Sequence, residues 1–224
     1  MNATEQQQIK VRKAARALAR GGLVNAYGHC SQRLDEQHFL VCAARPMGLI
    51  ANGEAGTVCT VDGALPEGVL GEVRMHQQIY KRRPEVGAVA RFLSPNVLAL
   101  SALGRTPKAR HGFGSYFFPE VPFWSDPGLI RNEAAAIGVG ETIGAASAIV
   151  VGVNGAVTAG VDIEQAVCLA WFLEDAARVE LAALAAGLAD SAPRMNEEQA
   201  RARATWAGRI AERMWEFLTA GDTE

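Results

Sequence analysis

The sequence lacks a strong excess of either charge, and it lacks a long hydrophobic run. Its 22 Lys and Arg residues and 24 Asp and Glu residues give a net charge of −2, so no bulk attraction to nucleic acid or to anionic membranes is expected. No apolar run reaches the roughly 18 residues that a membrane-spanning helix needs. The N-terminal residues also lack the apolar core of a signal peptide. These absences predict a cytoplasmic protein that binds neither nucleic acid nor membrane.

Cysteine is scarce, and the cysteines show no metal-binding or redox spacing. Cys30, Cys42, Cys59 and Cys168 form neither a Cys-x-x-Cys pair nor the paired spacing of a zinc ribbon. Thiols of the cytoplasm stay reduced, and a free cysteine behaves as a small hydrophobic residue. The sequence therefore predicts buried, reduced thiols rather than disulfides.

The composition that remains is that of an ordinary globular protein. The 224 residues are 49% hydrophobic and 21% charged, which suits a single domain with a sizeable core. Periodicity and turn signals predict helices and strands that alternate irregularly, as in an α/β or α+β fold. The expected helices are residues 4–21, 70–83, 95–103, 163–188 and 197–220, and the expected strands are residues 38–42, 57–61, 86–92, 147–153 and 156–159. The pair Asn154-Gly155 predicts a tight hairpin between the last two strands.

The last predicted helix belongs to a C-terminal helical extension, residues 194–224, of one domain that spans residues 1–224. Trp206, Met214 and Trp215 give this helix large apolar side chains. Such a helix packs on its own domain or contacts a neighbouring subunit, and the sequence leaves both readings open.

Five segments then occur in the order and spacing of a known family. They are Gly28-His29-Cys30-Ser31 with Arg33, Glu72-Val73-Arg74-Met75-His76, Gly87-Ala88-Val89-Ala90-Arg91-Phe92-Leu93-Ser94-Pro95, Asp126-Pro127-Gly128-Leu129-Ile130, and Thr158-Ala159-Gly160 with Trp171-Phe172-Leu173-Glu174. On these segments the chain resembles the class II aldolase/adducin family. The resemblance implies an α/β fold, an αβα sandwich with a mostly antiparallel central sheet flanked by helices. It also implies a homo-oligomer, such as a tetramer, with sites near subunit interfaces.

The sequence departs from the family pattern at one site, because the family's metal ligands are missing. The family carries His-x-His just before Ser-Pro and a third histidine in an Asn-His-Gly turn, and these bind a divalent metal such as zinc. Here the corresponding residues are Arg91, Leu93 and Asn154. Arginine and leucine offer a metal no lone pair. The sequence therefore predicts that no metal cofactor binds by the family geometry. A metal moved to His29, Glu72 and His111 is an alternative.

Four residues are candidates for catalysis. Glu72 matches a family carboxylate that works as a general acid or base, although a helix N-terminus favours a glutamate in any case. Arg91 follows an apolar strand, and a buried guanidinium needs an anionic partner. That partner is either Glu72, in a salt bridge, or a substrate carboxylate or enolate. His29 could titrate near neutral pH as an acid or base. His111 lies on a Gly-rich loop, where functional residues gather.

The substrate-binding candidates are Arg45, Ser31, Asn154 and Tyr116. The hydroxyl-bearing residues with which sugar-phosphate aldolases of the family hold phosphate are replaced by Cys42-Ala43-Ala44-Arg45 and by Leu70-Gly71. The apolar stretch Pro46-Met47-Gly48-Leu49-Ile50 favours an aromatic or alkyl substrate over a polyol. Arg45 remains as an anion contact. Asn154 has a simpler explanation as well, since Asn-Gly suits a hairpin turn.

Two classes of function follow. The first is a metal-independent lyase, a decarboxylase or an aldol-type carbon–carbon cleaving enzyme, acting on a non-phosphorylated small molecule that bears a carboxylate. Arg91 would replace the metal as the stabiliser of negative charge. Dehydration and isomerisation use the same groups. The second is an inactive, adducin-like binding or scaffold protein. A metal-dependent lyase with relocated ligands is a further alternative.

Overall fold

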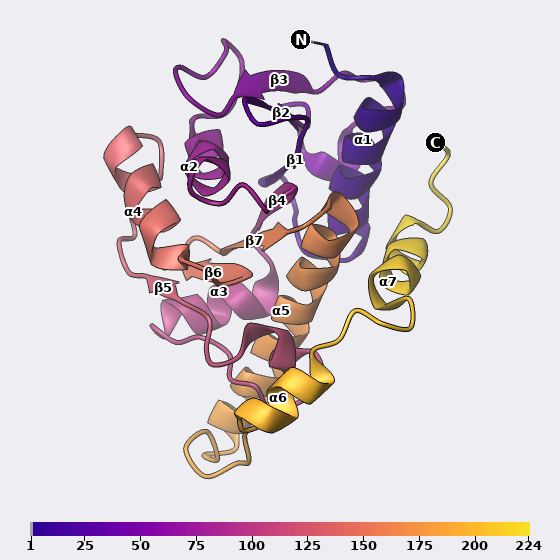
Figure 1. Ribbon diagram of the computed structural model, residues 1–224. Helices are drawn as coiled ribbons and strands as arrows, with labels where there is room; N and C mark the ends of the chain where they lie inside the picture. Colours follow the sequence, from indigo (N-terminus) through magenta and orange to yellow (C-terminus); the bar gives the residue numbers. More distant parts are fainter. Residues whose placement is uncertain (1) are drawn as a thin grey trace.

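A seven-stranded sheet lies between two layers of helices in the computed structural model, which describes residues 2–224 (Figure 1). The strand order is β3-β2-β1-β4-β7-β6-β5. Neighbouring strands are antiparallel except for β5 and β6, which are parallel. The strands are β1 (His29–Arg33), β2 (His38–Val41), β3 (Thr57–Thr60), β4 (Ala88–Phe92), β5 (Phe123–Trp124), β6 (Ala148–Val151) and β7 (Ala156–Gly160). The predicted mostly antiparallel αβα sandwich is confirmed.

The helices cover both faces of this sheet. Helices α2 and α4 lie on one side, and α1, α5 and α7 lie on the other (Figure 1). The α-helices are α1 (Glu5–Arg20), α2 (Arg74–Arg82), α3 (Pro95–Ala102), α4 (Glu133–Ile143), α5 (Ile163–Ala185), α6 (Glu197–Arg203) and α7 (Ile210–Thr219). Short 3-10 helices are η1 (Met47–Leu49), η2 (Gly71–Val73) and η3 (Gly114–Phe117). Within residues 2–224, no helix combines the length and the hydropathy that crossing a membrane requires.

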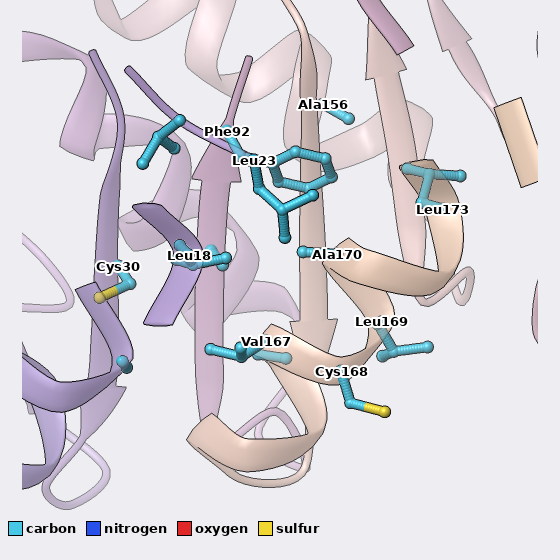
Figure 2. Close-up of a cluster of buried hydrophobic side chains, with 14 of the residues drawn as sticks. Leu18, Leu23, Cys30, Phe92, Ala156, Val167, Cys168, Leu169, Ala170 and Leu173 are labelled. Atoms are coloured by element: carbon cyan, nitrogen blue, oxygen red, sulfur yellow. The ribbon is translucent and has the colours of Figure 1, made fainter. Parts of the chain in front are cut away.

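Side-chain alternation along the central strand β4 divides the core in two. Ala90 and Phe92 face the layer of α1 and α5, and Figure 2 shows the Phe92 ring beside Leu23 above the small residues of α5. Val89 faces the opposite layer, formed by α2 and α4. Because successive side chains of a strand point to opposite faces, Arg91 shares the face of Val89. A charged residue therefore enters the core between the sheet and α2.

Two glycines let the chain approach the end of β4. Gly28 has a φ of 146°, and a Cβ there would lie 3.0 Å from the carbonyl oxygen of Arg91. Gly155 has a φ of 82°, and a Cβ there would lie 2.1 Å from the carbonyl oxygen of Phe92. Only glycine tolerates both the left-handed backbone and the close contact. These glycines set the backbone beside His29 and Asn154.

Several element boundaries differ from the sequence predictions. Strand β1 and helix α4 were not predicted, because the first mixes polar and apolar residues and the second is rich in Ala and Gly. The hairpin between β6 and β7 uses the four residues 152–155 rather than a two-residue turn. The predicted helix 197–220 is two helices, α6 and α7, because Gly208 and Arg209 adopt positive φ values of 79° and 60°.

The C-terminal extension packs on its own chain. Trp206, Met214 and Trp215 are partly buried against the core cluster that α1 and α5 form with the sheet. Trp206 also contacts the ring of Tyr116, with 4.8 Å between the ring centroids. These contacts support the interpretation that this segment packs on its own domain. The cysteines follow their prediction, since all four are buried and free.

Buried arginines of α1 hold the last residues of the chain. Arg16 donates to the Asp222 carboxylate over 2.6 Å and 2.7 Å, and Arg12 donates to the Glu224 carboxylate over 2.6 Å. Burial raises the pKa of Asp222, but hydrogen bonds from Arg16 and Arg20 outweigh it and hold that pKa well below its usual range. The Arg12 hydrogen bond lowers the pKa of Glu224 to about 2. This network docks the end of the chain on α1.

The network predicts an acid-sensitive contribution to stability. Asp222→Asn should lower the free energy of unfolding at pH 7 by about 2 kcal/mol, between the values typical of exposed and of buried ion pairs. Both carboxylates have lowered folded pKa values, so the contribution is present above the unfolded values of about 4 and fades as the pH falls toward the folded values. Urea unfolding of wild-type and variant between pH 3 and pH 7 measures this. The exposed Asp190→Asn serves as control, and a pH-independent difference would contradict the assignment.

Candidate active site

The polar candidates of β1 and β4 face the same helix. His29 and Ser31 alternate with Cys30, which packs in the core on the α1 and α5 side. The two polar side chains therefore point to the α2 side, as Arg91 does. His29 and Arg91 lie directly opposite each other in the pairing of β1 with β4. Strand pairing alone thus brings residues far apart in sequence into one buried site.

Arg91 is a buried cation held by a neutral group. Only 3% of the residue is exposed. Its Nη2 donates to the side-chain oxygen of Asn154 over 2.6 Å and approaches the Asn154 main-chain oxygen at 3.4 Å. Burial lowers the pKa of Arg91, and the nearby charge of Glu72 opposes that shift. The proposed Arg91–Glu72 salt bridge is not formed, so Glu72 acts on the guanidinium only through space.

Arg91 and Asn154, the residues expected to replace family metal ligands, therefore bind each other. Arg91 and Asn154 occupy the positions of two of the histidines expected from the family pattern, and they are joined by a short, charge-assisted hydrogen bond. The Nε and Nη1 donors of Arg91 make no hydrogen bond to any residue of the described chain. Asn154 is thus more than a turn residue. It orients a guanidinium that keeps donors for another partner.

Helix α2 places two polar side chains against Ser31. His76 and Tyr80 are four residues apart and so lie on the same helix face. The Ser31 Oγ is 2.6 Å from His76 Nδ1 and 2.8 Å from the Tyr80 hydroxyl. The other nitrogen of His76 is 2.8 Å from His29 Nδ1. A continuous buried chain of hydrogen bonds therefore runs from Tyr80 through Ser31 and His76 to His29.

Both imidazoles of this chain are neutral at physiological pH. Burial, followed by the proximity of His76 and of Arg91, lowers the pKa of His29 well below its usual value. Burial and Arg91 lower the pKa of His76 to about 3. The prediction that His29 titrates near neutral pH is therefore wrong, because the sequence could not show how deeply this residue is buried. His76 is a hydrogen-bonded histidine of helix α2.

A small cavity borders this chain on the side of Glu72. Its free volume is about 10 Å³, close to the space that one water molecule needs. Its wall includes His29, Leu70 and Val73, and the last two flank Gly71 and Glu72. Glu72 itself lies in η2, ahead of α2, and is half-buried. The candidate carboxylate and His29 thus come from segments that meet at one cavity.

Glu174 of α5 fixes the loop that follows β4. Its carboxylate accepts hydrogen bonds from the Ser94 hydroxyl at 2.5 Å and from the backbone amides of Asn96 and Val97 at 3.0 Å. These amides open α3, where a carboxylate is favoured by unpaired N–H groups. Glu174 therefore anchors the segment next to Arg91. The sequence offered only its place in a family motif as a signal.

The remaining candidates belong to other parts of the surface. His111 Nε2 lies 2.8 Å from the Asp175 carboxylate, and the Tyr116 hydroxyl donates to the Thr205 carbonyl. Neither side chain hydrogen-bonds to His29 or Arg91. Arg45 pairs with Glu54 at 3.1 Å, with about half of its side chain exposed. Within one chain, the structure therefore groups Glu72, His29, Ser31, Arg91 and Asn154, and it leaves His111, Tyr116 and Arg45 outside this group.

The donors in the group do not fit the metal that the family pattern implies. Arg91 has no lone pair to offer, Leu93 has no donor, and the Asn154 oxygen already accepts from Arg91. Across residues 2–224, no three His, Cys, Asp or Glu side chains are placed to hold a metal ion. The relocated site formed by His29, Glu72 and His111 therefore finds no support. Absence of a metal cofactor stays a prediction about the protein in solution.

Comparison with known proteins decides the family. The profile of the Class II Aldolase and Adducin N-terminal domain matches residues 9–181. This chain belongs to that family. The match spans both layers of the sandwich, from α1 through most of α5, and it includes every residue of the group around Arg91.

Two curated relatives of this family member share a function. The chain is 27% identical over 198 residues to a 3,4-dihydroxyphthalate decarboxylase of Terrabacter sp. (strain DBF63), covering 79% of this chain and 81% of the relative. It is 28% identical over 195 residues to the 3,4-dihydroxyphthalate decarboxylase of Arthrobacter keyseri, covering 78% and 77%. A solved L-fuculose 1-phosphate aldolase from Glaciozyma antarctica PI12 has a TM-score of 0.79 at 22% identity, covering 97% of this chain and 92% of that chain. The last likeness shows the shared fold.

The hydrogen bond between Arg91 and Asn154 predicts a strong energetic coupling. Asn154→Ala should reduce the free energy of unfolding by about 2 kcal/mol, because it leaves the buried guanidinium without its side-chain acceptor. In a double-mutant cycle with Arg91→Met, the two sites should couple by about 1.5–3 kcal/mol. Chemical unfolding of the four proteins measures the coupling. The exposed Asn25→Ala should be additive with Arg91→Met, and a coupling near zero for Asn154 would refute the assigned contact.

Proposed function

We propose that this family member is a decarboxylase-type lyase that acts on a small, non-phosphorylated carboxylate without the family metal. The expectation of a lyase for a carboxylate-bearing substrate is supported by the two 3,4-dihydroxyphthalate decarboxylases, each aligned over about four fifths of this chain. The observation that carries the metal-free part is the Arg91–Asn154 pair, which occupies two former ligand positions.

Arg91 suits a carboxylate because part of its guanidinium is still available. Nη2 is held by Asn154, whereas Nε and Nη1 have no acceptor among the residues that the structure describes. A guanidinium offers its donors in a planar fork that matches a carboxylate. The buried surroundings strengthen such a contact, because less water competes for the donors. Arg91 would therefore hold the anionic substrate and stabilise the negative charge that develops when a carbon–carbon bond breaks.

The reaction exchanges a carboxylate for a proton. The bond between the carboxyl carbon and its neighbour breaks, CO2 leaves, and the electron pair stays on the neighbouring carbon until that carbon accepts a proton. His29 and His76 do not supply this proton, because their lowered pKa values keep them neutral and without an acidic imidazolium. Glu72, whose charge reaches Arg91, is the candidate that takes up a proton from solvent water and passes it to this carbon. Retro-aldol cleavage would place the same charge in the same position.

An aromatic carboxylate fits the surroundings better than a sugar phosphate. The cavity beside His29 has room for about one oxygen atom rather than for a whole ligand, and it is walled largely by apolar residues such as Val41, Val69 and Leu70. Arg45, the remaining candidate for an anion contact near the start of η1, is already paired with Glu54. The positions that would hold phosphate in sugar-phosphate aldolases carry no hydroxyl in this sequence.

The oligomeric state is proposed on the family pattern. A homo-oligomer with sites near subunit interfaces would bring His111 or Tyr116 of a second copy toward the Arg91 group. Size-exclusion chromatography with light scattering measures this, and a monomer at assay concentration would refute it. A cytoplasmic location stays a prediction from the composition.

The proposed function predicts that Arg91 is essential for turnover. With 3,4-dihydroxyphthalate as substrate, Arg91→Gln should lower kcat/KM by about 100-fold or more, as loss of a group that stabilises developing charge does. Arg91→Lys should recover only part of this, because it keeps the charge and loses the fork. Release of CO2 and chromatography of the product measure the rate. The exposed Arg213→Gln is the matched control.

Two results would contradict the proposal. Full activity of Arg91→Gln would show that the guanidinium is not needed for catalysis. A wild-type protein that neither binds nor decarboxylates a panel of aromatic carboxylates would instead favour the adducin-like scaffold. Thermal shift with the same panel separates binding from turnover.

A further inference from the structure

One buried nitrogen of the site has no partner. The Nε2 atom of His29 is buried and makes no hydrogen bond within residues 2–224, although His29 is only 1% exposed. The other ring nitrogen of His29 is used by His76. Buried polar atoms are nearly always paired, so an unpaired one beside a cavity points to an absent partner. Whether this nitrogen donates or accepts depends on the tautomer of His29.

Tyr80 sets the direction of the hydrogen-bond chain that ends at His29. Burial raises the pKa of the Tyr80 hydroxyl far above its usual value, so the hydroxyl keeps its proton. Within residues 2–224, the only acceptor that this hydroxyl contacts is Ser31 Oγ, at 2.8 Å. The backbone amide of Val89 also approaches the Tyr80 oxygen as a donor. Tyr80 therefore donates its proton toward Ser31.

The remaining protons follow from this first bond. Ser31 accepts from Tyr80, so its single hydroxyl proton is free to be donated to His76 Nδ1, at 2.6 Å. His76 is neutral and must then carry its proton on Nε2, from which it donates to His29 Nδ1, at 2.8 Å. His29 is neutral as well, and its own proton lies on Nε2. The reverse direction would leave the buried Tyr80 proton without an acceptor.

We propose that Tyr80, Ser31 and His76 fix the tautomer of His29, so that a neutral Nε2–H is presented as a hydrogen-bond donor to an oxygen of the bound ligand. The donor would serve the cavity that His29 shares with Leu70 and Val73, whose volume of about 10 Å³ has room for a single ligand oxygen in the place of a water molecule. This oxygen would belong to a carboxylate or an aromatic hydroxyl, and that part of the proposal rests on the proposed function. His29 would be a binding group for the anion beside Arg91, and Tyr80 and His76 would be positioning residues.

A neutral donor suits this location better than a charged one. The Arg91 cation already lies opposite His29 in the paired strands, and a second buried positive charge would be repelled. A neutral imidazole still donates to a developing oxyanion, and it does so without changing protonation across the physiological range. The contribution of His29 to binding should therefore not vary between pH 6 and pH 8, because burial, with His76 and Arg91 nearby, keeps its pKa well below its usual value. Glu72, on the segment beside the cavity, is the other charged group in this contact region.

The tautomer is measured directly by nitrogen NMR. The chain contains four histidines, so ¹⁵N-histidine labelling with His38→Gln and His111→Gln variants assigns the imidazole signals of His29 and His76. The expected result is a protonated Nε2 and an unprotonated Nδ1 for both residues. Tyr80→Phe should release the constraint and mix the His29 tautomers, whereas Tyr116→Phe, which removes a hydroxyl bonded elsewhere, should leave them unchanged. A wild-type His29 protonated on Nδ1 would overturn the proposal, and this result does not depend on how Tyr80→Phe folds.

The proposed contact between His29 and a ligand oxygen is tested with phthalate, because its binding can be measured without a reaction. Phthalate should shift the His29 Nε2–H signal, and His29→Leu should weaken phthalate binding by about tenfold, the loss of one good hydrogen bond. His29→Gln, which keeps an N–H donor, should recover part of it. Phthalate binding that leaves the His29 signal unmoved, or no phthalate binding at all, would overturn the assigned donor. A protein with the expected tautomer and shift but no decarboxylation would refute the proposed reaction alone.

Discussion

The hydrogen bond between Arg91 and Asn154 is the constraint on which the rest of the site depends. An arginine that is only 3% exposed ordinarily requires a carboxylate, and here its side-chain acceptor is a neutral amide at 2.6 Å. The positive charge is therefore not cancelled within the site. Together with burial, which is the larger cause, it lowers the pKa values of His29 and His76, and it leaves guanidinium donors for an anion. A site built in this way favours a negatively charged ligand without a metal ion.

The fold supplies this constraint through ordinary sheet geometry. Alternation on β1 and β4 turns His29, Ser31 and Arg91 to one face, and the pairing of the strands sets His29 opposite Arg91. Helix α2 closes the face with His76 and Tyr80, one turn apart. The loop that carries Asn154 can reach Arg91 because Gly155 lets it pass within contact of the β4 backbone. Each of these features has its own structural reason, and together they form the site.

Local patterns predicted only an α/β or α+β fold, and the segments shared with the family narrowed this prediction to the sandwich. The anomaly at Arg91 was visible in the sequence as an apolar run followed by an arginine. The sequence could not show that Asn154, which suits a turn by itself, is the partner of Arg91, since that contact spans 63 positions. It also missed β1 as a strand, because polar His29 and Ser31 alternate there with buried Cys30. The hydrogen-bond chain from Tyr80 to His29 was not predicted for the same reason, because it depends on which face of β1 packs against α2.

The absence of the family metal is the central claim, and metal content tests it most directly. The protein should be purified without a metal-affinity tag, analysed by elemental mass spectrometry, and assayed for decarboxylation before and after treatment with a chelator. The account predicts zinc, manganese and iron far below one ion per chain, with activity unchanged by the chelator. Near-stoichiometric metal together with loss of activity on chelation would contradict it, and would mean that Arg91 does not replace the metal.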